Sequence, residues 1–323
     1  MKLRFFIFIA VGIFILYALS HAVDPKKLAR QISHFPKERI IFLCILSVII
    51  SLLKSWRFFL LLRKNNVKVK FWQICKVYIA GQSTTPIPGG EIFRSILLKH
   101  ETGVDTKQTS GAVVMQALIV FFSSAVIAII GSLVYGILIN IALITLTLII
   151  VVIYLILNQK IFMKLFSKMK EHQKLKKTAT TLIATHKGVR NNLLHRGSQH
   201  KPGITFMSSV GIGLVSNLVG GVMIYAIVSA YALPINFIQS VYIYSMSIII
   251  AAVSGIVPGG VGLAEGGIAG LLVLLKVEVS KAFAIVLIFR FINLVFYILF
   301  GLVFLLLFYS KTLIFTKKVK AKK

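Results

Sequence analysis

Long apolar segments follow one another along almost the whole chain, separated by short polar connections. About 20 apolar residues are enough to cross a bilayer as a helix, because a helix rises about 1.5 Å per residue. The pattern predicts eight membrane helices, at about 5–19, 40–62, 71–82, 111–130, 137–157, 204–230, 237–256 and 282–308. We therefore predict an all-α polytopic membrane protein.

Two of these apolar stretches are interrupted by proline and glycine beside charged residues. Residues 84–94 read TTPIPGGEIFR, and residues 257–266 read VPGGVGLAEG. Proline removes a backbone donor and glycine lowers helix propensity, so each sequence is expected to break its helix. The helix-breaking prolines are Pro86, Pro88 and Pro258. Bare backbone is tolerated at membrane depth only where protein buries it or where it lines a wet cavity. Both interruptions therefore indicate a transporter-like binding site.

Basic residues gather in a few connections and predict an orientation. Residues 160–201 carry eleven Lys and Arg against the single acid Glu171, and a lysine cluster ends the chain at 311–323. The positive-inside rule places both segments in the cytoplasm, with both termini on that side of an inner membrane. The chain then enters and leaves 71–98 from the cytoplasm, and enters and leaves 237–275 from outside. Both stretches are predicted to be re-entrant hairpins.

The two interruptions also suggest an internal repeat. Their Pro-Gly-Gly sequences, at 88–90 and 258–260, lie 170 residues apart. A shift by that amount lays helices of the second half over those of the first with reversed direction, which predicts an inverted 4+4 repeat of eight helices plus two hairpins. The predicted units are a first membrane half at 1–157 with its hairpin near 82–98, a basic cytoplasmic loop with an amphipathic surface helix at 158–203, a second membrane half at 204–310 with its hairpin near 257–275, and a basic tail at 311–323.

Composition and charge agree with this class of protein. Hydrophobic residues make up 58% of the chain and charged residues 14%, against about 25% charged residues in soluble proteins. The formal net charge of +29 predicts attraction to an anionic lipid leaflet rather than to nucleic acid. Cys44 and Cys75 lack metal-ligand spacing, and the seven histidines fall in loops or at helix ends. We predict no catalytic residue, no metal ion and no cofactor.

Four ionised residues lie at the interruptions or inside a predicted helix: Glu91, Arg94, Glu265 and Arg290. Each would cost about 2.5 to 3.5 kcal/mol if left alone at the bilayer centre. One interpretation is that they form salt bridges that lock the hairpins. The other is that they line a polar cavity for a lipid headgroup, with the arginines as forked donors to a phosphate and the glutamates holding a cationic group or the arginines.

Other candidates surround these four. Gly89, Gly90, Gly259 and Gly260 would let the backbone approach a ligand closely, or would serve only tight helix packing. Arg57 lies near the end of the predicted helix at 40–62. A long basic side chain there usually reaches out to the headgroups, and the alternative is that Arg57 faces the site.

At these residues the sequence resembles the lysylphosphatidylglycerol synthase transmembrane family, also called the flippase-like domain family. The family's first motif is matched by Pro86, Gly90, Glu91 and Arg94, its Pro-Gly-Gly-x-Gly-x-x-Glu motif by Pro258, Gly259, Gly260, Gly262 and Glu265, and its late-helix arginine by Arg290. The resemblance implies movement of a phospholipid, such as an aminoacylated phosphatidylglycerol, between leaflets. In that family the synthase activity resides in a separate cytosolic acyltransferase domain that uses aminoacyl-tRNA. We expect that domain to be absent here, so that the chain is a stand-alone member.

The predicted function is therefore lipid transport rather than enzymatic catalysis. Two alternatives stay open: a lipid-binding platform for a separately encoded aminoacyl transferase, and a small-solute secondary transporter, which the same repeat permits. The expected partners are an anionic or aminoacylated phospholipid and the membrane, with no nucleic acid. A second copy of the chain and a partner transferase are the candidate protein partners.

Overall fold

A computed structural model of the chain describes residues 25–65, 67–84, 90, 92–136, 202–253 and 263–320, together with a few residues between 140 and 158. Every regular element in these ranges is a helix. The predicted helix at 5–19, and most of the helix at 137–157 and of the loop at 158–203, lie outside the described residues.

The helices fall into two groups along the chain. The first group is α2 (Pro25–Ser33), α3 (Lys37–Lys64), α4 (Phe71–Ala80), the 3-10 helix η1 (Gly81–Thr84), α5 (Ile92–Thr102) and α6 (Thr106–Tyr135). The second group is α10 (Pro202–Ala230), α11 (Phe237–Val253), α12 (Leu263–Leu274), α13 (Val279–Arg290), the π-helix η3 (Phe291–Phe296) and α14 (Tyr297–Lys320).

Four helical segments in the described part are long and apolar enough to cross a bilayer: Lys37–Lys64, Thr109–Tyr135, Phe206–Ala230 and Val279–Tyr309. They confirm a membrane protein. The helices α4, α5 and α12 have 10, 11 and 12 residues and thus reach only about 15 to 18 Å, roughly half the thickness of the hydrocarbon core. The helix α11, with 17 residues, reaches about 25 Å. The predicted span at 71–82 is therefore shorter than a bilayer crossing, because α4 ends at Ala80 and the 3-10 helix η1 follows it. Helix α11 is described only as far as Val253.

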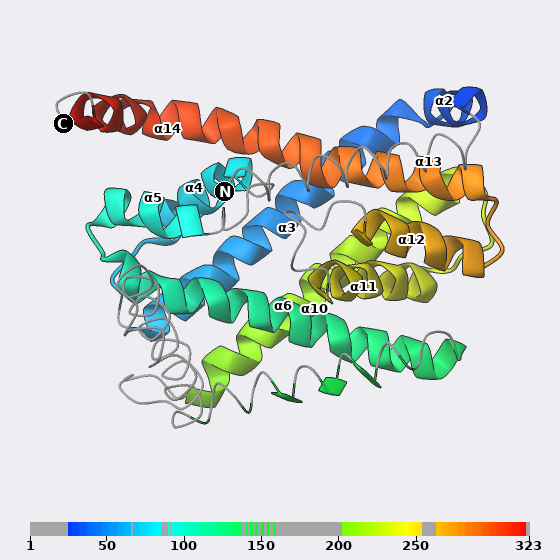
Figure 1. Ribbon diagram of the computed structural model, residues 1–323, viewed down its shortest axis with the longest axis horizontal. Coiled ribbons are helices and arrows are strands. Elements are labelled where there is room, and N and C mark those ends of the chain that lie inside the picture. Colours follow the sequence, from blue (N-terminus) through cyan, green and yellow to red (C-terminus); the bar gives the residue numbers. More distant parts are fainter. Residues whose placement is uncertain are drawn as a thin grey trace.

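The long helices frame the molecule and the short ones fill its two sides (Figure 1). In that view α13 and α14 run along the top, α6 runs along the bottom, and α3 and α10 pass diagonally between them. The pair α4 and α5 lies on the left, and the pair α11 and α12 on the right. Helix α4 packs on α3 and α14, whereas α11 packs on α10 and α6.

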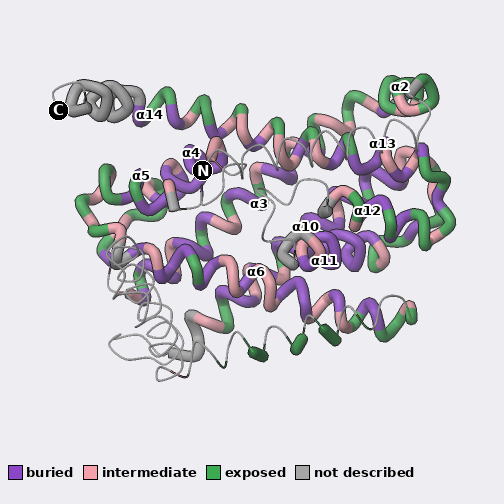
Figure 2. Tube along the Cα trace, viewed as in Figure 1, coloured by how far each residue is buried: buried purple, intermediate pink, exposed green. Residues whose placement is uncertain are grey.

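Buried apolar side chains form two separate clusters, one around each pair of short helices. The first is built from α10 to α13, with α3 up to Ile50 and α6 from Ala125 onward. The second is built from α4, α5 and α14, with α3 from Phe58 onward and α6 up to Ile119. Figure 2 shows the buried residues concentrated on α3, α10 and α11, while much of α14 is exposed. The helices α3, α6 and α10 pass from one cluster to the other.

Three features differ from the pattern predicted from sequence. A short helix, α2, forms in the connection after the first predicted helix. The predicted helix at 282–308 contains the π-helical segment η3, so its hydrogen-bonding pattern changes from α-helical to π-helical at Phe291. Helix α14 continues to Lys320, through most of the predicted basic tail.

Candidate functional site

Polar side chains are buried where the two apolar clusters meet. On α3, α6 and α10, every buried residue between the last member of one cluster and the first member of the other is polar or glycine. The polar ones are Ser51, Ser55 and Arg57 on α3, Ser123 and Ser124 on α6, and Ser216 and Asn217 on α10. We call these seven residues the polar layer. Three helices carry it at the same boundary, so it separates the two apolar interiors.

Hydrogen bonds join the polar layer across helices. The Nδ2 atom of Asn217 donates to Ser123 Oγ at 3.4 Å and to Ser124 Oγ at 3.2 Å, which ties α10 to α6. A methyl group on Gly213 would lie 2.8 Å from Ser123 Oγ and 3.4 Å from Arg57 Nη1. The guanidinium of Arg57, a residue only 1% exposed, is therefore packed between α3, α6 and α10. The structure therefore buries Arg57 among helices. The interpretation that its side chain reaches out to the lipid headgroups is wrong.

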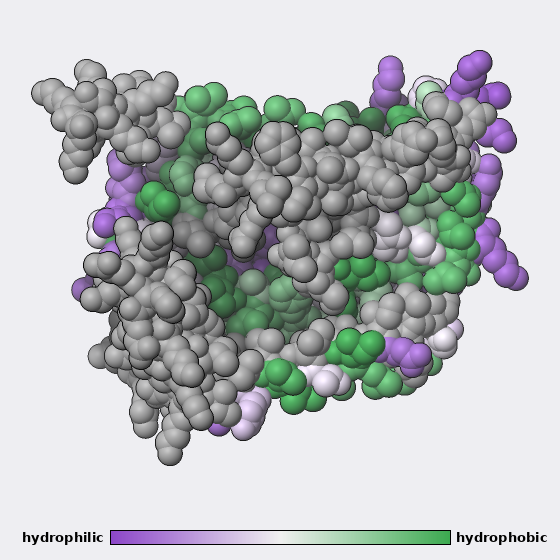
Figure 3. Space-filling model, viewed as in Figure 1, coloured by the Kyte–Doolittle hydropathy of each residue, from purple (hydrophilic) through white to green (hydrophobic). Residues whose placement is uncertain are grey.

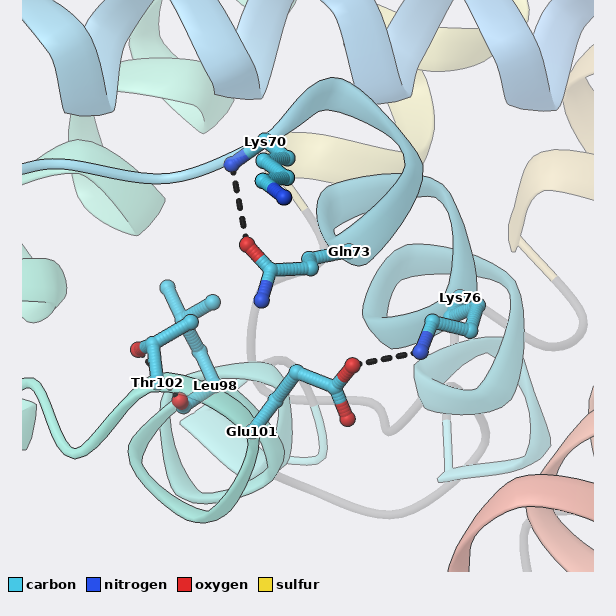
Figure 4. Close-up of polar contacts among 6 residues, drawn as sticks. All are labelled: Lys70, Gln73, Lys76, Leu98, Glu101 and Thr102. Carbon is cyan, nitrogen blue, oxygen red and sulfur yellow. Dashed lines mark hydrogen bonds and ion pairs between the residues drawn. The ribbon is translucent and has the colours of Figure 1, made fainter.

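The helices α4, η1 and α5 form an antiparallel pair around the first predicted break. Beside the break, Thr84 Oγ1 donates to the carbonyl oxygen of Gly90 at 3.0 Å. At the other end, Lys76 of α4 forms an ion pair with Glu101 of α5 (Figure 4). These two contacts hold both ends of the pair together. Four predicted residues of this break, Pro86, Pro88, Gly89 and Glu91, lie outside the described residues.

Arg94 is held inside this pair by an aromatic face and an amide. It is 4% exposed, its guanidinium lies 4.1 Å from the centre of the Tyr78 ring, and its Nη2 lies 3.5 Å from Gln82 Oε1. A methyl group on Gly81 would come within 2.5 Å of Arg94 Cγ. The 3-10 turn therefore needs glycine at this position to admit the arginine. A desolvated cation over a tyrosine ring is attracted by about 2 kcal/mol.

Gln116 connects α6 to the surroundings of Arg94. Its Nε2 donates to the Tyr78 hydroxyl at 3.1 Å and to the carbonyl oxygen of Lys54 at 3.2 Å. The Lys54 ammonium in turn lies 5.9 Å from the centre of the Tyr297 ring. Cationic and amide side chains from α3, η1, α5 and α6 thus lie around the Tyr78 and Tyr297 rings.

Glu265 and Arg290 form an ion pair between α12 and α13. Arg290 Nη2 donates to Glu265 Oε2 at 2.9 Å, and Arg290 Nε lies 2.7 Å from Oε1. Both side chains are 18% exposed. Glu265 lies in the first turn of α12, where the helix dipole favours an acid. Arg290 directly precedes η3, and π-helical segments are frequent at functional sites.

Two tyrosines, Tyr297 and Tyr244, lie between Arg290 and the polar layer. Tyr297, directly after η3, donates from its hydroxyl to the carbonyl oxygen of Ser47 at 3.0 Å. Tyr244 of α11 packs edge-on against Phe289, with ring centres 6.0 Å apart, and lies within electrostatic range of Arg57 and Tyr297. Polar side chains therefore continue from the end of α13 to α3.

The structure places some of the predicted site residues and leaves others undescribed. Glu265 and Arg290 are brought together, Arg94 lies against Tyr78 and Gln82, and Arg57 belongs to the polar layer. Gly90 is buried just before α5, the second helix of the first pair. The residues of the second break, Pro258, Gly259 and Gly260, lie outside the described residues, as do Pro86, Pro88, Gly89 and Glu91.

The uncharged residues of the site were not predicted from the sequence. A single amide inside a long apolar run was the available signal for Gln116 and Asn217, because a buried amide needs partners. Tyr78 and Tyr297 carried no such signal, since tyrosine is common in membrane helices and at their ends.

The face of the molecule in Figure 3 is hollowed near its centre, where a small hydrophilic surface lies at depth with hydrophobic surface below it.

Comparison with known proteins gives the family of the chain. A family model described as the lysylphosphatidylglycerol synthase TM region matches residues 5–301. This range includes the polar layer, both pairs of short helices and the Glu265–Arg290 pair. A search of curated proteins finds no match.

Proposed function

Because the chain belongs to the lysylphosphatidylglycerol synthase transmembrane family, we propose that it moves a phospholipid between leaflets, with an aminoacylated phosphatidylglycerol as the first candidate. The observation that carries this proposal is the polar layer between the two apolar clusters. A headgroup that crosses through a polar interior avoids the hydrocarbon, where one charge alone costs about 2.5 to 3.5 kcal/mol. The acyl chains can stay in the bilayer throughout.

The buried cations give the headgroup phosphate its binding groups. Arg94 and Arg57 would act as forked donors to the phosphate oxygens, which suit a planar guanidinium better than an ammonium. Glu265 and Glu91 would hold a cationic aminoacyl group, with Arg290 keeping Glu265 in place until the lipid arrives. The glycines Gly89, Gly90, Gly259 and Gly260 would let this lipid approach the backbone.

The packing of the helices supports an inverted repeat. The pair α4 and α5 meets α3, α6 and α14, and the pair α11 and α12 meets α10, α13 and α6. Exchange of α3 with α10, and of α6 with the α13–α14 helix, converts one set of neighbours into the other. In this proposal both pairs are re-entrant hairpins that open to opposite faces of an inner membrane, with both termini in the cytoplasm.

Reconstitution tests the proposal. Purified protein in liposomes with headgroup-labelled phosphatidylglycerol, and separately with its lysyl ester, is expected to speed movement between leaflets. Arg94→Ala, Glu91→Gln and Glu265→Gln are each expected to slow it about tenfold or more, which corresponds to about 1.4 kcal/mol in the barrier. Lys76→Gln is the matched control, since Lys76 and Glu101 are 16% and 18% exposed, much like the Glu265–Arg290 pair. Wild-type rates in all three site variants would refute the site assignment.

A charge exchange separates a locking ion pair from a binding pair. Glu265→Arg combined with Arg290→Glu keeps one charge of each sign. If the pair only locks α12 to α13, the exchange restores both thermal stability and lipid movement. If Glu265 receives the headgroup, stability recovers while movement stays slow.

The family description favours one other function. The words "synthase TM region" suit a membrane platform that presents lipid to a separate aminoacyl transferase. Co-purification of such an enzyme, together with a failure of the chain alone to move any lipid, would support the platform in place of the transporter.

A further inference from the structure

Helix α2 carries a cationic surface at the end of the bundle where α13 begins. It is turned out of the line of α13 and α14 in Figure 1, and it packs on α13. Its cations Lys26, Lys27 and Arg30 are all exposed. The helix therefore lies across the end of the long helices instead of continuing one of them.

Contacts from distant parts of the chain fix α2 in this position. Gln31 Nε2 donates to Ser280 Oγ at 3.4 Å, and the Tyr231 hydroxyl donates to the carbonyl oxygen of Gln31 at 3.0 Å. Phe35, 5% exposed, packs on the Tyr231 ring with centres 6.1 Å apart. Burial raises the pKa of Tyr231 to about 12, so this donor keeps its proton at physiological pH. The cations of α2 are thus presented in a fixed direction.

Seven of the nine residues of α2 fall on three faces. At about 100° per residue, Leu28 and Gln31 point to one side, and they are the half-buried ones that face the protein. Lys26, Lys27 and Arg30 share a second side. Ala29 and Ile32 occupy the third, where Ile32 is 39% exposed. An apolar face and a cationic face, both turned away from the packing contact, are typical of a helix that lies in a membrane interface.

Further charges surround α2 at this end. Lys276 and Lys281 lie on the α12–α13 connection and the first turn of α13, and Lys37 begins α3. The acids here are Glu38 and Glu278, the latter accepting from Ser280 Oγ at 2.6 Å. Hydrophilic surface gathers over α2 and over the α12–α13 connection in Figure 3. The cations outnumber the acids among the described residues of this end.

We propose that α2 is an interfacial helix that binds the phosphate groups of anionic phospholipids on the membrane face where α13 begins. Clustered cations beside a bilayer attract acidic lipids, and the Ile32 face would enter the boundary with the acyl chains. Along α13, which has 12 residues, this lipid surface is about 18 Å from Arg290. The binding itself does not depend on lipid transport.

A short-range quenching experiment tests this proposal. A fluorophore is attached at Ser33→Cys in full-length protein that carries Cys44→Ser and Cys75→Ser, reconstituted in phosphatidylcholine vesicles. The quencher is a nitroxide high on the acyl chain of either phosphatidylglycerol or phosphatidylcholine. Phosphatidylglycerol is expected to quench at least about twofold more strongly. The variant Lys26→Gln/Lys27→Gln/Arg30→Gln should remove this difference.

The matched control neutralises three exposed cations of the opposite end, Lys68→Gln/Lys70→Gln/Lys99→Gln, and should keep the preference. Equal quenching by both lipids before any cation is removed would overturn the proposal. So would an equal loss in the two triple variants, because the preference would then come from net charge alone. An unchanged melting temperature in the α2 variant shows that its loss is not unfolding.

Discussion

The two pairs of short helices differ in where their charged side chains find partners. In α4 and α5 the ion pair lies within the pair, because Lys76 meets Glu101, and Arg94 lies over Tyr78. Aromatic contacts reach outside it, from Lys76 to Phe308 and from His100 to Tyr309 of α14. In α11 and α12 the only charged residue is Glu265, which reaches outside the pair to Arg290 of α13. The pairs share a similar set of helical neighbours but not an arrangement of charges.

This difference assigns different mechanical roles to the two pairs. Ion pairing and stacking inside α4 and α5 tie the two arms to each other, so the pair is expected to move as one unit. The Glu265–Arg290 contact ties α12 to α13 instead, just before the π-helical η3. A ligand that competes for Glu265 would therefore loosen α12 from α13, whereas a ligand at Arg94 would leave the first pair intact.

The largest effect on stability is expected from Glu265→Gln. It removes the ion pair between Glu265 and the Arg290 guanidinium in a mostly buried place. A fully buried pair costs about 3 to 5 kcal/mol to break in this way, and the 18% exposure of both side chains lowers our expectation to about 2 to 3 kcal/mol. Thermal unfolding in detergent measures the loss. Glu38→Gln, at an exposed acid of α3, is the control, and a loss no larger than in that control would remove the proposed tie between α12 and α13.

A somewhat smaller effect, about 1 to 3 kcal/mol, is expected from Gly301→Ala. A methyl group there would lie 2.6 Å from Ser83 N and 2.8 Å from Ile79 O, and backbone atoms cannot rotate away. Helix α14 would be pushed off η1, which would loosen the first pair without touching its charges. Gly270→Ala on α12 is the control, since nothing lies within 4 Å of the added methyl. Similar melting temperatures for both variants would show that α14 does not hold the first pair.

The parts of the fold that depend only on a segment's own sequence could be predicted. The described helices α3, α6 and α10 begin and end within a few residues of predictions based only on apolar length, because such helices are stable in lipid without a particular partner. The family resemblance, seen in two Pro-Gly motifs and a late arginine, is confirmed by the match over 5–301.

Features that depend on distant contacts could not be predicted in this way. Helix α2 is too short and polar to be expected alone, and it is held by Tyr231 and Ser280 from much later in the chain. The sequence also left the ion-pair partner of Arg290 undetermined, because Glu91 and Glu265 carry the same charge. The amide and tyrosine members of the site become apparent only when helices are packed together: Gln116 with Tyr78, Asn217 with Ser124, and Tyr297 with Ser47.

Tyr78→Leu is expected to destabilise the protein by about 1 to 2 kcal/mol. It removes the ring under Arg94, whose cation–π contact contributes about 1 to 2 kcal/mol. It also removes the hydroxyl that accepts from Gln116, which keeps its hydrogen bond to the Lys54 carbonyl oxygen. Tyr78→Phe is the matched variant, because it keeps the aromatic face and loses only the hydrogen bond. Thermal melts that place Phe close to wild type and Leu well below would assign the effect to stacking, whereas equal losses would assign it to Gln116.

The smallest effect is expected from Lys76→Gln, at about 0.5 to 1 kcal/mol. The Lys76–Glu101 pair lies near the open end of the first pair of helices, where its side chains are 16% and 18% exposed, and partly solvated pairs contribute little. Arg94 over Tyr78 and the Thr84–Gly90 hydrogen bond still join the two arms, so the pair should stay closed. Hydrogen exchange of α5 amides measures this closure directly. Fast exchange along all of α5, with α12 unchanged, would show that this single ion pair and not the buried arginine holds the arms together.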